Sequence, residues 1–366
     1  MDAQRSGKMA EASKASEDLL PWVEKYRPNS LDEVLAHQHI TATLEKFVEA
    51  NQLPHLLFYG PPGTGKTSTI IALAARLYGK SFKNHVLELN ASDDRGIDVV
   101  RGQIKAFAST RNMFSMQQDT FKLIILDEAD AMTQAAQAAL RRSMYHALMA
   151  VMEQYTRNVR FCIICNYVNK IIPAIQSRCT RFRFAPLEAA QVERRIDSVI
   201  AAEKYARTAD HRCHVEPAAK QAILQLCQGD MRRALNILQA CHAANDRIDE
   251  DSVYNCTGHP HPKDIETAFQ AMLQQEFTTA YQSTWRLLTS AIQSLKIDKG
   301  TALTDLLTGM HSLVMSLELP AHARAYLLDQ MATIEYRLST NASERVQLSA
   351  LLASVKVAVE LAQKAS

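Results

Sequence analysis

The sequence predicts an α/β domain with a parallel sheet, followed by a small helical domain and an all-helical C-terminal domain. In the first half of the chain, short apolar runs alternate with segments of helical period, and this alternation is typical of a parallel sheet covered by helices. Beyond Pro186, every strong apolar period is helical. The 366 residues also provide enough length for two or three domains with cores of their own.

The expected strands are short runs rich in apolar residues. They cover residues 56–59, 86–90, 123–127, 160–165 and 180–184. Helices are expected around residues 41–50, 68–77, 96–110 and 133–155. Near the C-terminus the helical period is clearest at Leu303, Leu306, Leu307, Met310, Leu313 and Val314.

Residues 60–67 form the most specific motif of the chain. Their sequence, Gly-Pro-Pro-Gly-Thr-Gly-Lys-Thr, matches the phosphate-binding pattern G-x-x-x-x-G-K-[ST] between an expected strand and an expected helix. In such a loop backbone N–H groups and the helix dipole face the phosphates, Lys66 reaches the β- and γ-phosphates, and the Thr67 hydroxyl ligates Mg²⁺. An ordinary glycine-rich turn is the alternative. The flanking elements favour a nucleotide-binding site with Mg²⁺, formed by Gly60, Pro61, Pro62, Gly63, Thr64, Gly65, Lys66, Thr67 and Ser68.

An acidic box follows the third expected strand, with the sequence Asp127-Glu128-Ala129-Asp130. In proteins with a phosphate-binding loop, a carboxylate at the end of this strand holds Mg²⁺, and its neighbour can polarise the attacking water. Asp127 fits the first role and Glu128 fits the second. The alternative is a polar loop after a core strand, which is common in α/β folds.

Composition and charge exclude few function classes. A net charge of +2 does not by itself indicate a nucleic-acid-binding protein, so any basic surface must be local. Hydrophobic residues make up 47% of the chain, but no uninterrupted apolar run approaches membrane-spanning length. The first 20 residues are polar and lack the apolar core of a signal peptide. We therefore expect a soluble protein with a disordered N-terminal tail.

The seven cysteines are scattered and odd in number, as expected for reduced thiols in a cytosolic or nuclear protein. Cys162 and Cys165 have C-x-x-C spacing, but strand alternation would point their sulfurs to opposite faces of a sheet. His211, Cys213 and His214 are close in sequence, yet no second ligand pair has metal-site spacing. A metal or redox site built on cysteine is therefore not expected.

Several motifs together resemble one protein family. In chain order they are Pro21-Trp-Val-Glu-Lys-Tyr-Arg-Pro28, the loop at residues 60–67, Asn90-Ala-Ser-Asp-Asp-Arg-Gly96, the acidic box, Ser177-Arg178-Cys179 and Gly229-Asp-Met-Arg-Arg-Ala-Leu235. The set resembles the small subunits of replication factor C, the AAA+ clamp loader of eukaryotic and archaeal DNA replication. The resemblance extends from about residue 20 to the end of the chain. The segments most similar to one eukaryotic branch, numbered three in yeast and five in human, are residues 97–101, 108–111 and 256–260.

The resemblance implies a division of the chain into four regions. After the tail at residues 1–20, an AAA+ nucleotide-binding domain would cover residues 21–186. A helical lid domain would follow over residues 187–258, and a helical collar domain that joins subunits would cover residues 259–366. The last boundary falls in Gly258-His-Pro-His-Pro262, which has the composition of a linker.

The resemblance also implies a composite ATP site at the junction between subunits. Val23, Arg27 and the region of Leu35 would border the adenine. Asn166, at the end of an expected strand, would act as sensor 1 near the γ-phosphate, and Arg232 on the lid would act as sensor 2. Without the resemblance, Asn166 would be interpreted as a strand-end cap and Arg232 as a solvated helix charge.

Arg178 has the most distinctive implied role. In the family, this arginine reaches across the interface to the γ-phosphate held by a neighbouring subunit. Such an arginine finger stabilises the charge that builds on the transferring phosphoryl group and can contribute roughly 10³–10⁵ in rate. The alternative is a plain surface arginine.

DNA contacts are implied for the helix that follows Arg95, because in the family this helix follows a DNA strand along its phosphates. Arg101 and Lys105 lie one turn apart on it, and Arg111 follows its end. Such contacts position the protein without reading sequence, and they make binding dependent on salt. Asp98 lies three residues before Arg101, so an intrahelical salt-bridge face is the alternative.

One segment departs from the family pattern. Residues 143–150 are inserted between Arg142 and a Val-Met-Glu-Gln-Tyr stretch, and the apolar spacing on both sides favours one longer helix. Two extra turns would move the end of that helix by roughly 12 Å. Roles for Arg141 and Arg142 at a subunit junction are therefore not assigned.

The resemblance thus implies an ATPase subunit of the heteropentameric sliding-clamp loader, acting in the nucleus in replication and repair. ATP would favour the spiral that opens the clamp and holds primer–template DNA, and hydrolysis would release both. A nucleotide-locked structural subunit is one alternative, against which the complete set of Lys66, Asp127 and Glu128 argues. An AAA+ protein remodeller is a more distant one, because no aromatic pore loop follows Asn90.

Overall fold

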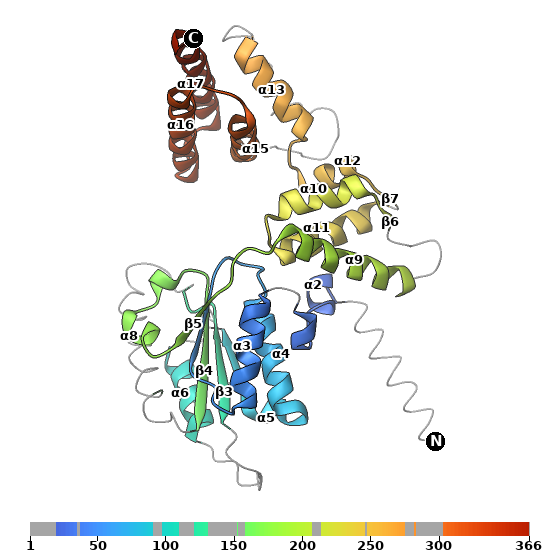
Figure 1. The fold of residues 1–366 in the computed structure, drawn as a ribbon, viewed down its shortest axis with the longest axis vertical. Helices are drawn as coiled ribbons and strands as arrows, with labels where there is room; N and C mark the ends of the chain where they lie inside the picture. Colours follow the sequence, from blue (N-terminus) through green and yellow to red (C-terminus); the bar gives the residue numbers. More distant parts are fainter. Residues whose placement is uncertain are drawn as a thin grey trace. The chain divides into compact units, whose positions relative to one another are not determined.

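A five-stranded parallel sheet forms the centre of the first half of the chain in the computed structural model (Figure 1). Its strands are β1 (Leu56–Tyr59), β2 (Val86–Asn90), β3 (Lys122–Asp127), β4 (Val159–Cys165) and β5 (Thr180–Arg183). The order across the sheet is β2-β3-β4-β1-β5, and every neighbouring pair is parallel. The expected parallel sheet is confirmed, with each strand boundary within one residue of its expected position.

The structure describes residues 20–34, 37–90, 97–109, 121–130, 152, 158–206, 214–245, 247–274, 282 and 303–365. The helix expected over residues 133–155 and the inserted residues 143–150 therefore lie outside the described residues, as does nearly all of the N-terminal tail.

Helices cover both faces of the sheet (Figure 1). On one side lie α3 (Gln38–Glu49) and α4 (Lys66–Tyr78), followed by the short α5 (Phe82–His85). On the other side lie α6 (Ile97–Ser109) and α8 (Pro173–Gln176). This two-sided covering explains why the strands are apolar along their whole length, since a parallel sheet is buried on both faces.

Alternate residues of each strand enter different cores, as the period of two requires. Leu57, Ile124 and Ile163 pack with residues of α6 and α8, whereas their neighbours in sequence pack with residues of α3 and α4. Cys162 belongs to the second core and Cys165 to the first. The prediction that these two sulfurs point to opposite faces is confirmed.

After the sheet the chain is mainly helical, with α9 (Ala189–Ala206), α10 (Pro217–Cys227), α11 (Met231–Ala244) and α12 (Glu250–Thr257). A two-stranded sheet of β6 (His214–Val215) and β7 (Arg247–Ile248) interrupts this region. The prediction that this region is wholly helical was wrong, because strands of two residues show no detectable hydrophobic period.

The C-terminal helices are α13 (Pro262–Gln274), α15 (Leu303–Ser316), α16 (Ala321–Ser339) and α17 (Glu344–Ala365). They share one apolar core, to which the predicted stripe of α15 contributes Leu303, Leu306, Leu307, Met310 and Val314. The segment Glu344–Gln363 is long and apolar enough to cross a membrane by length and composition alone. Its residues Leu348, Leu351 and Val355 are buried in this core.

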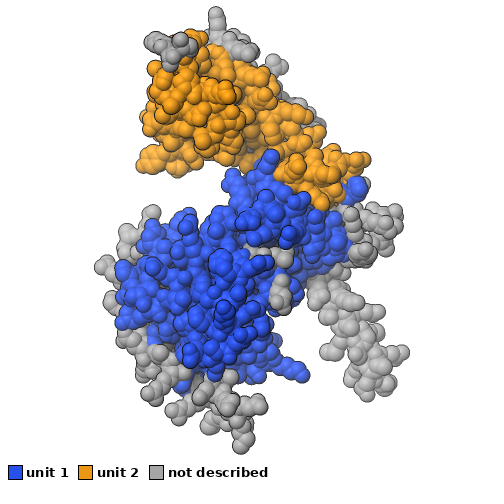
Figure 2. All heavy atoms as spheres, in the orientation of Figure 1, with its two compact units in different colours: residues 1–214, 223–239 blue, residues 215–222, 240–366 orange. Residues whose placement is uncertain are grey.

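The chain forms two units (Figure 2). One consists of residues 1–214 and 223–239, and it contains the parallel sheet. The other consists of residues 215–222 and 240–366, and it contains the C-terminal helices. All contacts of the site described next lie within the first unit.

Candidate functional site

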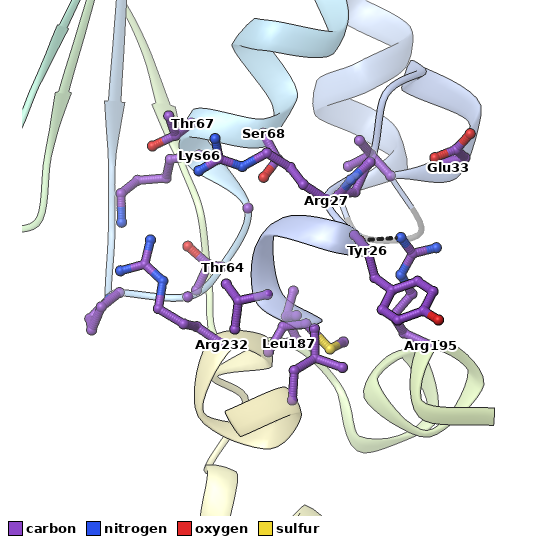
Figure 3. Close-up of a pocket in the computed structure, with 18 of the residues that line it drawn as sticks. Tyr26, Arg27, Glu33, Thr64, Lys66, Thr67, Ser68, Leu187, Arg195 and Arg232 are labelled. Carbon is purple, nitrogen blue, oxygen red and sulfur yellow. Dashed lines mark hydrogen bonds between the residues drawn. The ribbon is translucent and has the colours of Figure 1, made fainter. Parts of the chain in front are cut away.

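The carboxyl ends of three parallel strands meet at one edge of the sheet and open into a pocket (Figure 3). Residues 60–67 follow β1, Asp127 and Glu128 stand at the end of β3, and Asn166 follows β4. This edge is where ligands bind in open α/β sheets. The site residues predicted from the sequence that line the pocket are Val23, Arg27, Pro62, Gly63, Thr64, Gly65, Lys66, Thr67, Ser68, Asp127, Glu128, Asn166 and Arg232.

Lys66 begins α4 and is 7% exposed. Its Nζ donates to the carbonyl oxygens of Gly60 at 2.8 Å and Pro61 at 2.7 Å, and to Oδ1 of Asn166 at 3.1 Å. Burial lowers the pKa of Lys66, while the carboxylate of Asp127 acts to raise it. The loop therefore holds a largely desolvated cation at its mouth, beside the amide expected to serve as sensor 1.

Thr67 and Asp127 form an oxygen pair that suits a hard divalent cation. The Thr67 hydroxyl donates to Oδ2 of Asp127 at 2.7 Å, and the other carboxylate oxygen accepts from the Glu128 N–H at 2.8 Å. A hydroxyl and a carboxylate at this spacing are the ligands that Mg²⁺ takes in sites of this kind. The residues present therefore fit the predicted metal.

Glu128 lines the same pocket and is exposed. Its backbone has a φ of 51°, in the left-handed region that non-glycine residues rarely adopt. Such conformations cost free energy and tend to occur at functional sites. The carboxylate thus stands beside the Asp127–Thr67 pair and remains accessible to water.

Asp130 has a structural role that was not predicted from the sequence. It is 4% exposed, and its two oxygens accept from the backbone N–H groups of Asn166 at 3.1 Å and Tyr167 at 2.9 Å. Because Asn166 in turn accepts from Lys66, Asp130 orients the turn that carries the amide. Its place in the acidic box was the one signal in the sequence that pointed to it.

Replacing Asp130 with asparagine should reduce kcat for ATP hydrolysis by about tenfold, with little change in ATP affinity. The amide places an N–H₂ group where one backbone N–H now finds an acceptor, so the Asn166 turn loses a charge-assisted bond. Steady-state kinetics of Asp130→Asn, Asn166→Ala and the double variant check this. If Asp130→Asn lowers kcat equally in the presence and absence of the Asn166 side chain, Asp130 does not act through Asn166.

Two glycines of the loop are in close contact with other segments. A Cβ at Gly60 would lie 2.0 Å from the carbonyl oxygen of Phe184, just after β5. A Cβ at Gly63 would lie 1.6 Å from Oδ1 of Asp230, at the start of α11. Asp230 caps α11 by accepting from the Arg233 N–H at 3.1 Å, and the Met231 N–H donates to the Gly63 carbonyl at 3.2 Å. The loop is therefore packed directly against the first turn of α11.

Arg232 lies in this first turn, and Figure 3 shows its guanidinium extending toward Lys66. Its charge is one of the influences that lower the pKa of Lys66, after burial. Two cations from different segments thus face one space. An anion such as a triphosphate would bring them together.

The remaining residues that line the pocket were largely missed by the sequence analysis. Val23 of α2 (Trp22–Lys25) and Arg27 line it as predicted, but Leu35 lies outside the described residues. The additional lining residues are Tyr26, Pro28, Glu33, Val34, Leu187, Gln191, Arg195, Met231 and Leu235. Several are apolar residues on helices, and nothing in the sequence distinguishes them from core residues.

Arg178 does not line this pocket. It is exposed after α8, and its Nη1 donates to the Ala174 carbonyl at 2.9 Å. Of the predicted DNA-binding residues, Arg101 and Lys105 belong to α6, but the structure does not describe their side chains. Arg95 and Arg111 lie outside the described residues. Within the described residues, no group of three His, Cys, Asp or Glu side chains could hold a metal ion.

Comparisons with known proteins agree with this geometry. Residues 56–187 match the model of the ATPase family associated with various cellular activities (AAA), and residues 260–354 match the replication factor C C-terminal domain. The chain is 55% identical to replication factor C subunit 3 of Schizosaccharomyces pombe, covering 95% of this chain and 94% of that one. It is 51% identical to subunit 5 of Homo sapiens, covering 93% of each, and 48% identical to subunit 3 of Saccharomyces cerevisiae, covering 95% and 96%. The chain therefore belongs to the replication factor C family of AAA+ proteins and is a clamp-loader ATPase subunit.

Proposed function

We propose that this subunit binds ATP with Mg²⁺ in the pocket of Figure 3 and hydrolyses it with the help of a neighbouring subunit. The observation that carries the proposal is the convergence of Lys66, Asn166 and Arg232 on one end of the pocket, beside the Thr67–Asp127 oxygen pair. Triphosphate oxygens would replace the loop carbonyls and the Asn166 amide as partners of the lysine.

The chain's own groups would divide the chemistry among them. Thr67 and Asp127 would hold the Mg²⁺, which when bound neutralises charge on the β- and γ-phosphates. Glu128 would accept a proton from the attacking water, and Asn166 would orient that water or the γ-phosphate. Arg232 would bind the γ-phosphate from α11. The direct contact between Gly63 and the cap of α11 supports this last role, because nucleotide and helix would share one loop.

We further propose that Arg178 acts on the ATP of the adjacent subunit in a heteropentamer. Its exposure, and its absence from this chain's own pocket, support a role in trans. The assembly would open a sliding clamp and hold primer–template DNA in the nucleus, with phosphate contacts from Arg95, Arg101, Lys105 and Arg111. Binding would then weaken steeply with salt.

The proposed domains are residues 21–186 for nucleotide binding, 187–258 for the lid and 259–366 for the collar. The first matched family region, residues 56–187, falls inside the first of these domains except for its last residue, and the second, residues 260–354, falls inside the third.

Lys66→Ala should weaken ATP binding by about tenfold to a hundredfold and leave the fold intact. The variant loses charge-assisted bonds to phosphate, each worth about 1.5–3 kcal/mol, and loses no apolar core contact. Thermal unfolding with and without ATP–Mg²⁺ measures this, with Lys46→Ala on the exposed side of α3 as the matched control. A nucleotide-induced rise in Tm as large for Lys66→Ala as for the parent would rule out the loop as the ATP site.

A further inference from the structure

A buried carboxylate on α9 stands outside the pocket and outside the chemistry derived above. Glu203 is 1% exposed. It accepts from the Tyr26 hydroxyl at 2.6 Å and from Nζ of Lys25 at 2.9 Å. Burying an ionised carboxylate is costly unless charge and hydrogen bonds compensate for the lost water. These two donors come from one short segment near the N-terminus.

The same segment is held by two further bonds. Arg195, also on α9, donates to the Tyr26 carbonyl at 2.6 Å, a contact drawn in Figure 3. The Trp22 N–H donates to Oε1 of Gln239 on α11 at 3.0 Å, and the Trp22 side chain is buried. Residues 22–26 are thus bonded to α9 and α11.

The segment then crosses to the sheet along the pocket. Leu31 is 5% exposed and packs in the core formed by α3, α4 and the sheet. Between the two anchors, Arg27 and Pro28 line the pocket, and Val34 lines it just after Leu31. The position of this wall is therefore set at one end by the sheet core and at the other by the partners of Tyr26.

The wall has the chemistry of a base-binding surface. Val23, Val34, Leu187 and Leu235 provide apolar area in the lining of the pocket, and Figure 3 shows Tyr26 and Arg195 at the end away from Lys66 and Thr67. A flat heteroaromatic base would be covered by such residues, while its phosphates would lie among the cations at the other end. Misplacing Tyr26 and its neighbours should affect binding of the base and leave the phosphate end unchanged.

We propose that Glu203 is a positioning residue for the nucleotide base: by holding Lys25 and Tyr26, it fixes the N-terminal wall of the pocket without touching the ligand. This inference rests on the ATP site proposed above. It assigns part of the ATP affinity to a side chain of α9 that lies outside the phosphate loop and the acidic box.

The test compares ATP with inorganic tripolyphosphate, which has the charge of the triphosphate but no base. For the full chain, Glu203→Ala should raise the Kd for ATP about tenfold, the loss expected for one charge-assisted bond, and change the Kd for tripolyphosphate less than twofold. In the assembled complex, KM for ATP should rise while kcat at saturating ATP stays within about twofold. Isothermal titration and steady-state kinetics supply these values.

Further variants separate positioning from general loosening of the fold. Ile223→Val trims a buried residue of α10 that has no bond to the N-terminal segment, and it should leave both Kd values unchanged. Glu203→Gln retains an acceptor for the Tyr26 hydroxyl and should restore part of the ATP affinity. Lys25→Met removes the bond from Lys25 to Glu203 and keeps the apolar stem, so it provides a second test if Glu203→Ala does not fold.

Equal weakening of ATP and tripolyphosphate by Glu203→Ala, or no weakening of ATP by either Glu203→Ala or Lys25→Met, would overturn the positioning role. Failure of the parent chain to bind either compound would instead overturn the proposed ATP site. The two failures are thus distinguishable.

Discussion

Replacing Arg178 with alanine should slow ATP hydrolysis at the neighbouring subunit's site by roughly 10³- to 10⁵-fold, the effect of removing an arginine finger. The affinity of this chain for its own ATP should stay nearly unchanged, because Arg178 is exposed after α8 and does not line the pocket that contains Lys66. Single-turnover hydrolysis by the reconstituted complex measures the first effect. ATP titration of the isolated variant measures the second.

The direction of action can be tested by combining two changes. Complexes carrying Lys66→Ala, Arg178→Ala or both in this subunit are compared for total turnover. If the finger acts in trans, the two substitutions disable different junctions and their losses combine. If Arg178→Ala causes no further loss once Lys66 is gone, the guanidinium serves this chain's own site and the composite junction is wrong.

Glu128→Gln should slow ATP hydrolysis at this subunit's site by about 10²- to 10⁴-fold, while ATP binding persists. The amide keeps the shape of the side chain but cannot accept a proton from the attacking water. The backbone N–H of residue 128 would still donate to Asp127, so the Mg²⁺ ligands would be undisturbed. The measurement is ATP binding and single-turnover hydrolysis in complexes where only this subunit is altered.

Asp130→Glu is the control for Glu128→Gln. It disturbs the Asn166 turn but retains every charge of the acidic box, whereas Glu128→Gln removes one of those charges. Clamp opening should continue with ATP in the Glu128→Gln complex. A turnover rate that is unchanged by Glu128→Gln would mean that this site holds its nucleotide without hydrolysing it, which is the nucleotide-locked alternative.

The sheet and the phosphate end of the site could be predicted because their signals are local. Each strand is a continuous apolar run, and the loop at residues 60–67 carries its chemistry in consecutive positions. The parallel topology then forces Asp127 and Asn166 to the same edge as the loop. Lys66 and Asn166, 100 residues apart, are in hydrogen-bond contact for this reason.

The rest of the site could not be predicted because it depends on contacts between distant segments. From the sequence, Glu203 would be interpreted as one more exposed charge on an amphipathic helix. Only the structure shows that it accepts hydrogen bonds from Lys25 and Tyr26. Leu187 and Leu235 have the same pattern as residues of a helical core, although they line the pocket. Asp130 was visible in the acidic box, but its bonds to the turn after β4 require the register between β3 and β4.

The contact between Gly63 and Asp230 restricts how this protein can evolve. Position 63 is one of the variable places of the motif G-x-x-x-x-G-K-[ST], so phosphate binding alone does not demand glycine there. The carboxylate that caps α11 leaves no room for a methyl group, and the φ of 67° disfavours one as well. Enlarging residue 63 would therefore require the Asp230 carboxylate to move aside or to be replaced by a smaller group, and either change would lose the bond that begins the helix bearing Arg232. Selection should act on the two positions as a pair, across a separation of 167 residues in the sequence.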